Sequence, residues 1–558
     1  MKFPKGSAGL YPLLVVLLAV FAVAPLEYPG AFQSHTGLLA YYNLIALDQN
    51  PLQFFSWMPT LGRAPDLFRS DGALPYFIAL IFSRLGFGYL GAIKLVYALA
   101  WIASGLTMFA LARKFFSDAG AMLAAVVYIY LPFHIATVYV RGAFAESVAW
   151  AIFPVALLSV VSRQSTAVSQ QSSVNKVLRF TFYALPFALL YLTQPGIAIL
   201  FALVAFAIAF ATRGRTTPLS QSQRDFQSLN FSIPIFSGLA FGALLTLPAI
   251  LRNNARILRD GFEPNFVLPF QLFSSLWGFG ASTGNFLDQF PLQIGIAPLG
   301  LAIIAIALGW HANDERSGER SLQRIIAMFL AVALVLIALT FEITSPIWNV
   351  LGIFVAAPWQ LLAFVGLAFA FVAGAVIEFD PRFARPMMLA FFVALPVVAS
   401  YGYLAPKFLD VKPTRPQIAI FGNNEIALLD YRIVGPLRHG ATLRVHLTWQ
   451  ALRPIYNDYT VFVQAVHENG NTYGQSDNKP QDGSLPTIKW QAGQVINDMH
   501  AVQIDVEGPS EGFYLQIGLY KSATGERALI TAGADSLRVP RPGDPDPVIT
   551  DQLLPGQK

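Results

Sequence analysis

The chain has 558 residues, of which 55% are hydrophobic and only 12% are charged, with a net charge of +5. Soluble domains carry about 25% charged residues, so this composition excludes an ordinary soluble protein over most of the length. The absence of cysteine excludes disulfides, cysteine-ligated zinc and a thiol nucleophile. Residues 1–406 hold 23 of the 37 Lys and Arg residues but only 16 of the 32 Asp and Glu residues. Such a basic excess orients the loops of an apolar domain and does not predict a nucleic acid partner.

Eleven apolar segments are long enough to be considered as membrane-spanning helices, which need about 20 mostly apolar residues. The first, "LYPLLVVLLAVFAVAPL", follows Lys2 and Lys5 and could be a secretory signal, but the many later segments favour an uncleaved span. The piece 74–86 is shorter and is expected to lie at the membrane surface or to dip into it. The expected spans are 10–26, 90–112, 118–137, 145–162, 179–194, 196–212, 232–251, 293–310, 325–342, 357–378 and 387–404.

The distribution of basic residues predicts how these helices are oriented. With a cytoplasmic N-terminus, 15 Lys and Arg residues fall on the cytoplasmic side and eight fall outside before residue 407, as the positive-inside rule requires. We therefore expect a multi-pass plasma membrane protein with a transmembrane domain over 1–406 and residues 407–558 outside the cytoplasm. Two long loops, 27–89 and 252–292, fall on the outer side, where chemistry is expected.

Residues 407–558 have a different pattern from the rest of the chain. Stretches such as "TLRVHLTWQAL" and "YTVFVQAVHENGNTYG" alternate apolar and polar residues, with turn signals between them. This predicts a C-terminal all-β sandwich. Trp449, Trp490, Tyr459 and Tyr514 could stack on sugars, but the favoured interpretation is that they fill the core. His446, His467 and His500 have no metal-ligand spacing.

The first outer loop carries the candidate catalytic groups. Residues 36–48 predict a short helix lying on the membrane, with Leu38, Leu39, Tyr42, Ile45 and Ala46 on one side. The titratable or charged members of this region are Glu27, His35, Asp48, Arg63, Asp66, Arg69 and Asp71. Arginine binds phosphate with a planar fork of donors, and a carboxylate can deprotonate an acceptor hydroxyl. The alternative is that these charges only solvate the loop.

Arg141 and Glu146 lie between two apolar segments, at the expected outer edge of the membrane. One interpretation is structural: Glu146 is favoured by the helix dipole by about 0.3–1 kcal/mol, and Arg141 extends to the lipid head groups. The other is functional: Arg141 binds a lipid phosphate, and Glu146 orients it or the acceptor. A second basic group follows the seventh span, where Arg252, Arg256 and Arg259 share a helix face. That stripe either contacts phosphate or anchors the helix at head groups.

Several stretches together resemble the bacterial membrane proteins named "6-pyruvoyl-tetrahydropterin synthase-related". They are "WMPTLGRAPDLF", "LPYFIALIF", "VRGAFAESVAWAIFPVALL", "YLTQPGIAIL", "FPLQIGIAPLGLA" and "SPIWNVLGIFVAAPWQLLAF". The resemblance implies a GT-C-like polytopic glycosyltransferase that uses polyprenyl-phosphate-linked sugars, and "LRVHLTWQAL" resembles the sandwich often appended to such enzymes. The chain departs from that family in three places. It has no carboxylate beside His35, Gln194 replaces a histidine, and Gln360 replaces an arginine.

The resemblance implies a transferase in which Asp48 or Asp71 is the base, His35 is auxiliary, and Arg141 with the basic stripe holds phosphate. The implied partners are membrane lipid, a polyprenyl-phosphate-sugar donor and a glycan or envelope acceptor. A divalent metal, if one takes part, would be held by carboxylates of the first loop, although no metal ligand is assigned. The departures favour an alternative, a catalytically inactive membrane protein that binds lipid-linked glycans or assembles envelope components. A transporter is a weaker alternative, because Lys94 is the main charge inside a span.

Overall fold

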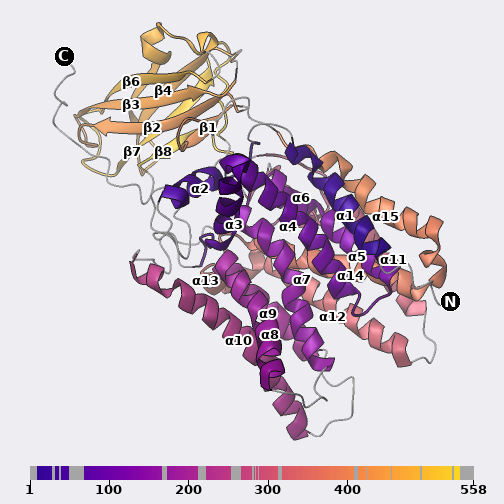
Figure 1. The fold of residues 1–558 in the computed structure, drawn as a ribbon. Helices are drawn as coiled ribbons and strands as arrows, with labels where there is room; N and C mark the ends of the chain where they lie inside the picture. The colour runs from indigo at the N-terminus through magenta and orange to yellow at the C-terminus, as the bar shows by residue number, and fades with distance from the viewer. Residues whose placement is uncertain are drawn as a thin grey trace.

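The computed structural model describes most of the helical domain and of the C-terminal domain. The described residues are 9–27, 32–36, 39–49, 68–165, 173–211, 221–252, 265–279, 282, 284–286, 288–311, 317–407, 413–422, 424–453, 455, 457–490, 493–530 and 533–540. Within them, helices fill the first part of the chain and strands the last (Figure 1). The α-helices are α1 (Leu10–Val23), α2 (Leu39–Gln49), α3 (Leu74–Phe82), α4 (Gly88–Ala112), α5 (Asp118–Ile129), α6 (Pro132–Tyr139), α7 (Phe144–Ser165), α8 (Ser173–Thr193), α9 (Pro195–Ala211), α10 (Gln221–Arg252), α11 (Ile296–His311), α12 (Ser317–Leu339), α13 (Ser345–Leu351), α14 (Leu362–Phe379) and α15 (Pro386–Ser400).

Every expected spanning segment lies on helical structure, but not every one is long enough to cross a membrane alone. In the described part, six helical stretches are long and apolar enough, or seven if one bent pair counts as a single span. Four further apolar helices are shorter: Phe180–Thr193, Pro195–Phe210, Ser232–Leu247 and Ile296–Trp310. The prediction of a polytopic helical domain followed by an all-β domain is confirmed. The number of spans stays a prediction.

The third expected span, 118–137, consists of two helices with a bend between them. α5 ends at Ile129 and α6 begins at Pro132, with a bend of 43° between them. The cause is Pro132, because the residue before a proline is driven out of the helical conformation. The short helix α6 is therefore a separate element, and Arg141 follows shortly after its end. The piece 74–86 also differs from expectation, because α3 continues through a turn at Ser83–Phe87 into α4.

The C-terminal domain is built from two sheets that enclose one apolar core. In its described residues each sheet has four antiparallel strands, in the orders β1-β2-β3-β6 and β5-β4-β7-β8. Trp449, Trp490 and Tyr459 are buried in that core, as the structural interpretation predicted. That interpretation is wrong for Tyr514, which is only half-buried and has the Arg538 guanidinium carbon 3.8 Å from its ring. The strands are β1 (Ala419–Phe421), β2 (Ile426–Val434), β3 (Thr442–Ala451), β4 (Tyr459–His467), β5 (Thr472–Asn478), β6 (Val495–Gln503), β7 (Phe513–Lys521) and β8 (Leu537–Val539).

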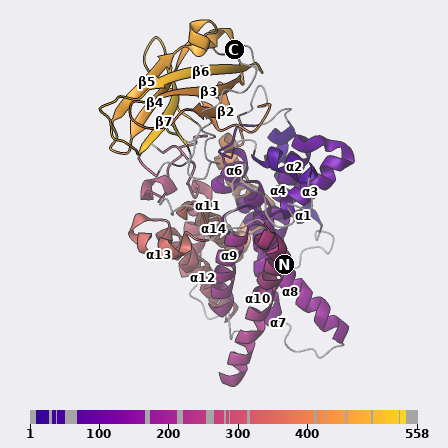
Figure 2. The same ribbon diagram turned by 90° about the vertical axis from the view of Figure 1, so that its left-hand side faces the viewer.

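The sandwich lies beside α2 at one end of the helical domain, as both ribbon views show (Figures 1 and 2). An apolar cluster of Ile420, Ala427, Leu429 and Leu452 packs against Tyr41, Tyr42 and Leu90. The Tyr42 hydroxyl also donates a hydrogen bond of 2.8 Å to the Pro413 carbonyl. Helix α2 is thus covered by the sandwich at Tyr41 and Tyr42, and that it lies flat on the membrane stays a prediction. Its buried residues are Asn43, Leu44 and Leu47.

Candidate functional site

The site begins where α6 ends. After Tyr139 the backbone turns through Gly142, which has a φ of 63°, and α7 starts at Phe144 with Glu146 in its first turn. The Arg141 and Gly142 amides bond back to the carbonyls of Ala136 and Val138. This tight turn directs the Arg141 side chain toward the start of α7, where the helix dipole favours a carboxylate.

Arg141 and Glu146 form a bidentate ion pair inside the protein. Nη1 and Nη2 of Arg141 each donate a hydrogen bond of 2.6 Å to one oxygen of Glu146. The side chains are only 6% and 1% exposed. The interpretation in which Arg141 extends to lipid head groups is therefore wrong, because the guanidinium lies in the interior. Its two terminal nitrogens face a carboxylate rather than open space.

Aromatic and amide side chains from the segment before α14 complete the surroundings of this pair. The Arg141 guanidinium carbon lies 4.6 Å from the centroid of the Trp359 ring, a cation–π arrangement. Nε2 of Gln360 donates a bond of 3.4 Å to Glu146, while its Oε1 accepts the Ala356 and Ala357 amides at 2.9 and 3.2 Å. Gln360 thus fixes the turn before α14 and contacts Glu146.

Asp71 is brought to the same place by a loop that is held from two sides. The Gly72 amide donates to the Thr193 carbonyl at the break between α8 and α9, and Nε of Arg69 donates 2.7 Å to the Gly352 carbonyl. A Cβ on Gly72 would overlap the carbonyl of Leu192, so this close approach requires glycine. The loop delivers Asp71 into the interior, where Tyr76 donates a hydrogen bond of 2.9 Å to it.

The electrostatic state of Asp71 is set by its burial and by the neighbouring pair. Burial raises the pKa of Asp71 to about 6, against the opposing hydrogen bond from Tyr76. The negative charge of Glu146 adds to the rise, and the positive charge of Arg141 opposes it. The opposite charges of Arg141 and Glu146 nearly cancel, so the pair does not offset the rise in the pKa of Asp71 that burial causes. Asp71 is a carboxyl group that changes charge close to neutral pH.

His35 reaches the site through the segment 32–36, which lies along the turn after α6. The amides of His35 and Thr36 donate to the carbonyls of Val140 and Arg141 at 2.8 and 3.0 Å. A Cβ on Gly142 would overlap the Ser34 side chain. Glycine is therefore needed at this position to let segment 32–36 approach the turn, as well as for the positive φ. Burial, with a smaller contribution from the Arg141 charge, lowers the pKa of His35 to about 4. The imidazole is therefore neutral at pH 7.

The other predicted site residues are not brought to this cluster by the described structure. Asp48 lies at the end of α2, bonded at 2.7 Å to both Arg84 and the Tyr89 hydroxyl. Arg252 is the last residue of α10, and its side chain is outside what the structure describes. Arg256 and Arg259 lie outside the described residues, as do Arg63 and Asp66.

Three residues that the sequence analysis did not assign belong to the site: Tyr76, Trp359 and Gln360. Gln360 was noticed only as a departure from a family pattern, and nothing marked Trp359 or Tyr76 in a chain rich in aromatics. Nε1 of Trp359 is buried without a hydrogen-bond partner among the described residues, which leaves a donor free beside Arg141. In the same residues, no three His, Asp or Glu side chains form a group that could hold a metal ion.

Comparison with protein-family models finds no match for this chain, and comparison with curated protein sequences finds none either. Among solved structures, ArnT from Cupriavidus metallidurans bound to undecaprenyl phosphate is 11% identical with a TM-score of 0.30, over 72% of this chain and 90% of that one. The apo state of the same protein is 12% identical with a TM-score of 0.34, over 68% of this chain and 79% of that one. A third structure is the archaeal oligosaccharyltransferase AglB from Archaeoglobus fulgidus in complex with an inhibitory peptide and a dolichol-phosphate. It is 13% identical with a TM-score of 0.37, over 72% of this chain. The match spans 56% of the AglB chain.

Proposed function

We propose that this chain is a membrane-embedded, GT-C-like glycosyltransferase that moves a sugar from a polyprenyl-phosphate-linked donor to an acceptor hydroxyl on the extracytoplasmic face. The observation that carries the proposal is Asp71. It is a buried carboxyl group with a pKa of about 6 that interacts with both charges of the Arg141–Glu146 pair, and His35 interacts with the same Arg141. A general base works best when its pKa lies near the operating pH, and burial of this kind is a mark of functional sites.

The proposed chemistry assigns the base to Asp71 and not to Asp48. Ionised Asp71 accepts the proton of the acceptor hydroxyl while that oxygen forms a bond to the anomeric carbon of the sugar. The bond between that carbon and the lipid phosphate oxygen breaks, and the lipid phosphate leaves. Tyr76 donates a hydrogen bond to one carboxylate oxygen of Asp71, which fixes the plane of the carboxyl group. The direction of the second oxygen is then fixed as well. Neutral His35 offers a ring nitrogen for hydrogen bonding, which is the auxiliary role predicted for it.

The Arg141–Glu146 pair acts in this proposal by positioning rather than by binding phosphate. Both terminal nitrogens of Arg141 are engaged, and the backbone of residues 140–142 carries the segment that presents His35. The phosphate of the donor is then assigned to the stripe of Arg252, Arg256 and Arg259, which remains a proposal from the sequence. The same holds for the identity of the acceptor.

The test is sugar transfer from a radiolabelled polyprenyl-phosphate sugar by the purified full-length protein in lipid nanodiscs. We expect Asp71→Asn to reduce transfer by at least 100-fold, as removal of a general base does. Asp48→Asn is the matched control, because it removes a carboxylate of the same loop that is bonded to Arg84 and Tyr89 instead. Equal transfer by the wild type and Asp71→Asn would overturn the assignment of the base.

One observation favours the alternative of a binding protein without turnover. The guanidinium of Arg141 is almost fully covered and already paired with Glu146, so it does not stabilise a leaving phosphate in this conformation. This alternative predicts saturable binding of the polyprenyl-phosphate sugar with no product, and no change in that binding when Asp71 is replaced by Asn.

The proposed orientation places the site outside the cytoplasm, with the N-terminus inside. It is supported by the distribution of Lys and Arg in residues 1–406 and by the position of the sandwich. The sandwich contacts α2 through Tyr41 and Tyr42, and the Gln33 amide bonds to the Lys407 carbonyl. The segment that carries His35 and the C-terminal domain thus share one side. Labelling of an introduced cysteine at Gly470 by a membrane-impermeant reagent in intact cells tests this orientation, and protection from the reagent would reverse it.

A further inference from the structure

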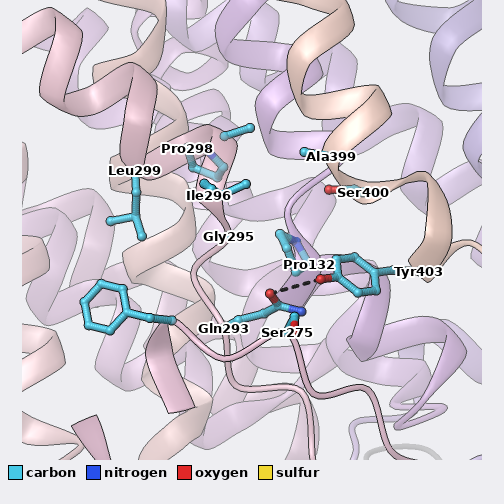
Figure 3. Close-up of a pocket in the computed structure, with 12 residues that line it drawn as sticks. Pro132, Ser275, Gln293, Gly295, Ile296, Pro298, Leu299, Ala399, Ser400 and Tyr403 are labelled. Carbon is cyan, nitrogen blue, oxygen red and sulfur yellow. Dashed lines mark hydrogen bonds between the residues drawn. The ribbon is translucent and has the colours of Figure 1, made fainter. Parts of the chain in front are cut away.

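A cavity lies where the start of α11, the end of α15 and the start of α6 meet. Its volume is about 300 Å³, and it is lined by the loop around Ser275, the first turn of α11 and the end of α15 with Tyr403 (Figure 3). Pro132, the first residue of α6, also lines it. The next residue, Phe133, contacts the candidate site, since its ring centroid lies 5.8 Å from the guanidinium carbon of Arg141. The Phe133 and Trp359 ring centroids are 6.3 Å apart, and both rings lie against Arg141.

One polar group of this cavity, the side-chain amide of Gln293, has a hydrogen-bond donor without a partner among the described residues. The Tyr403 hydroxyl donates a bond of 3.3 Å to Oε1 of Gln293, and Tyr403 is itself held by stacking on Trp277 at 4.3 Å. In this arrangement Oε1 of Gln293 accepts from Tyr403, and Nε2 is the free end of the amide. Nε2 is buried without a partner among the described residues, and Gln293 lines the cavity (Figure 3). A buried donor without a partner destabilises the protein by about 1–3 kcal/mol, so a ligand that accepts a hydrogen bond is expected here.

The lining carries no formal charge. Its named residues are Pro132, Phe273, Ser275, Gln293, Gly295, Ile296, Ala297, Pro298, Leu299, Ala399, Ser400 and Tyr403. Arg and Lys, the strongest donors to a phosphate or carboxylate, are absent from these lining residues, whereas a carbonyl oxygen is matched by a neutral donor. The N-terminus of α11 adds the positive end of a helix dipole at the same place. The charge balance of the cavity therefore favours an uncharged oxygen acceptor.

The outer rim of the cavity is apolar and open to the side. Ile296 is 80% exposed, and Val398, next to the lining residue Ala399, is 74% exposed. Side chains of this kind on a spanning helix face lipid rather than water. A cavity of about 300 Å³ is at the small end for ligand pockets, so it accommodates part of a lipid whose remainder lies outside.

We propose that this cavity binds the ester region of one diacyl glycerophospholipid. An ester carbonyl accepts the hydrogen bond from Nε2 of Gln293, and the acyl chain lies along the exposed apolar surfaces of α11 and α15. This site differs from the Asp71 cluster in its lining residues and in its lack of charge, and the proposal does not depend on the proposed transferase activity. The occupant is a bilayer lipid and not the polyprenyl-phosphate donor.

The experiment measures lipid binding by the full-length protein without any turnover. Protein in nanodiscs is irradiated with a diester phosphatidylethanolamine that carries a diazirine near the carboxyl end of one acyl chain, and the labelled peptides are mapped by mass spectrometry. We expect labelling at 293–299 and 399–403. Unlabelled diester lipid should compete about three- to tenfold better than the matching diether lipid, which lacks the carbonyls, the difference that one hydrogen bond gives.

Two variants and a control make the result specific. Gln293→Leu keeps the volume and removes the donor, so it should abolish the preference for diester over diether lipid. Ala399→Trp fills the cavity and should lower labelling about tenfold. Ile303→Trp makes the same large addition on a lipid-facing part of α11 that is outside the cavity, and should leave labelling unchanged. Size-exclusion profiles and thermal unfolding of each variant separate lost binding from lost folding.

Three outcomes would overturn the proposal. The first is equal competition by diester and diether lipids, and the second is an unchanged preference in Gln293→Leu. The third is displacement of the label by polyprenyl phosphate at stoichiometric amounts, which would make the cavity part of a donor site instead.

Discussion

Arg141 and Glu146, five residues apart in the chain, face each other across the junction of α6 and α7 with two hydrogen bonds of 2.6 Å. Neither charge reaches solvent, so each depends on the other. Removing one partner of such a pair leaves an uncompensated buried charge, whereas replacing both with apolar residues is often neutral.

Glu146→Gln should therefore lower the free energy of unfolding by roughly 3–5 kcal/mol. The double variant Arg141→Met/Glu146→Leu should be much closer to the wild type, because no unpaired charge remains. Thermal or denaturant unfolding in detergent measures both. A double variant that is as unstable as Glu146→Gln would show that the pair also makes contacts that apolar side chains cannot replace.

Asp71→Asn should stabilise the protein at neutral pH while abolishing the proposed transfer. The folded pKa of about 6 lies above the unfolded value, so the folded state loses stability as pH rises from about 4 to 6 and the buried carboxyl ionises. Asparagine is never charged. The variant should gain up to about 3 kcal/mol above pH 6 and nothing near pH 3.5. Unfolding curves at pH 3.5, 5 and 7.5 test this, and a gain that is independent of pH would contradict the assignment.

The same pKa predicts how the proposed activity depends on pH. Transfer requires ionised Asp71, so its rate should rise with pH through about 6 with the slope of a single proton and then level off. His35 adds no second step in this range, since its pKa is about 4. A pH–rate profile in nanodiscs checks the prediction. A midpoint below 5 would assign the base to an exposed carboxylate.

Gly142→Ala should separate the segment 32–36 from the turn after α6. The position has a φ of 63°, and an added Cβ would overlap Ser34. The expected loss of stability is about 1–3 kcal/mol, with faster hydrogen exchange at the His35 and Thr36 amides. Gly300→Ala is the control, since its Cβ would meet nothing within 4 Å in α11 and should be neutral or stabilising by about 0.5–1 kcal/mol.

Asp48→Ala should leave transfer unchanged and lower stability by no more than about 1 kcal/mol, the range for exposed ion pairs. Its partner Arg84 has a side chain that is 62% exposed. Transfer assays of this variant beside Asp71→Asn decide between the two carboxylates that the sequence left open as bases. A large loss with Asp48→Ala alone would place the chemistry at α2.

The architecture was largely predictable because its signals are local. Long apolar runs specify helices such as α4 and α14 whatever they contact, and alternation in "TLRVHLTWQAL" specifies β3 from neighbouring residues only. Two features were not predicted. Pro132 divides the third expected span into α5 and α6, and the hydrogen bond that joins α2 to the C-terminal part of the chain links Tyr42 to Pro413, which are far apart in the sequence.

The sequence by itself determined that this is a helical membrane domain followed by a β domain, because hydrophobic length and period are properties of contiguous residues. It also singled out Arg141 with Glu146, which lie only five residues apart in the chain. Only the tertiary structure decided that Asp71, and not Asp48, joins them. That choice depends on contacts between distant segments, at Gly72 against Leu192 and at Gly142 against Ser34. It depends equally on burial, which raises the pKa of Asp71 and covers Arg141. Burial is a property of the folded chain and cannot be known from the type of a single residue.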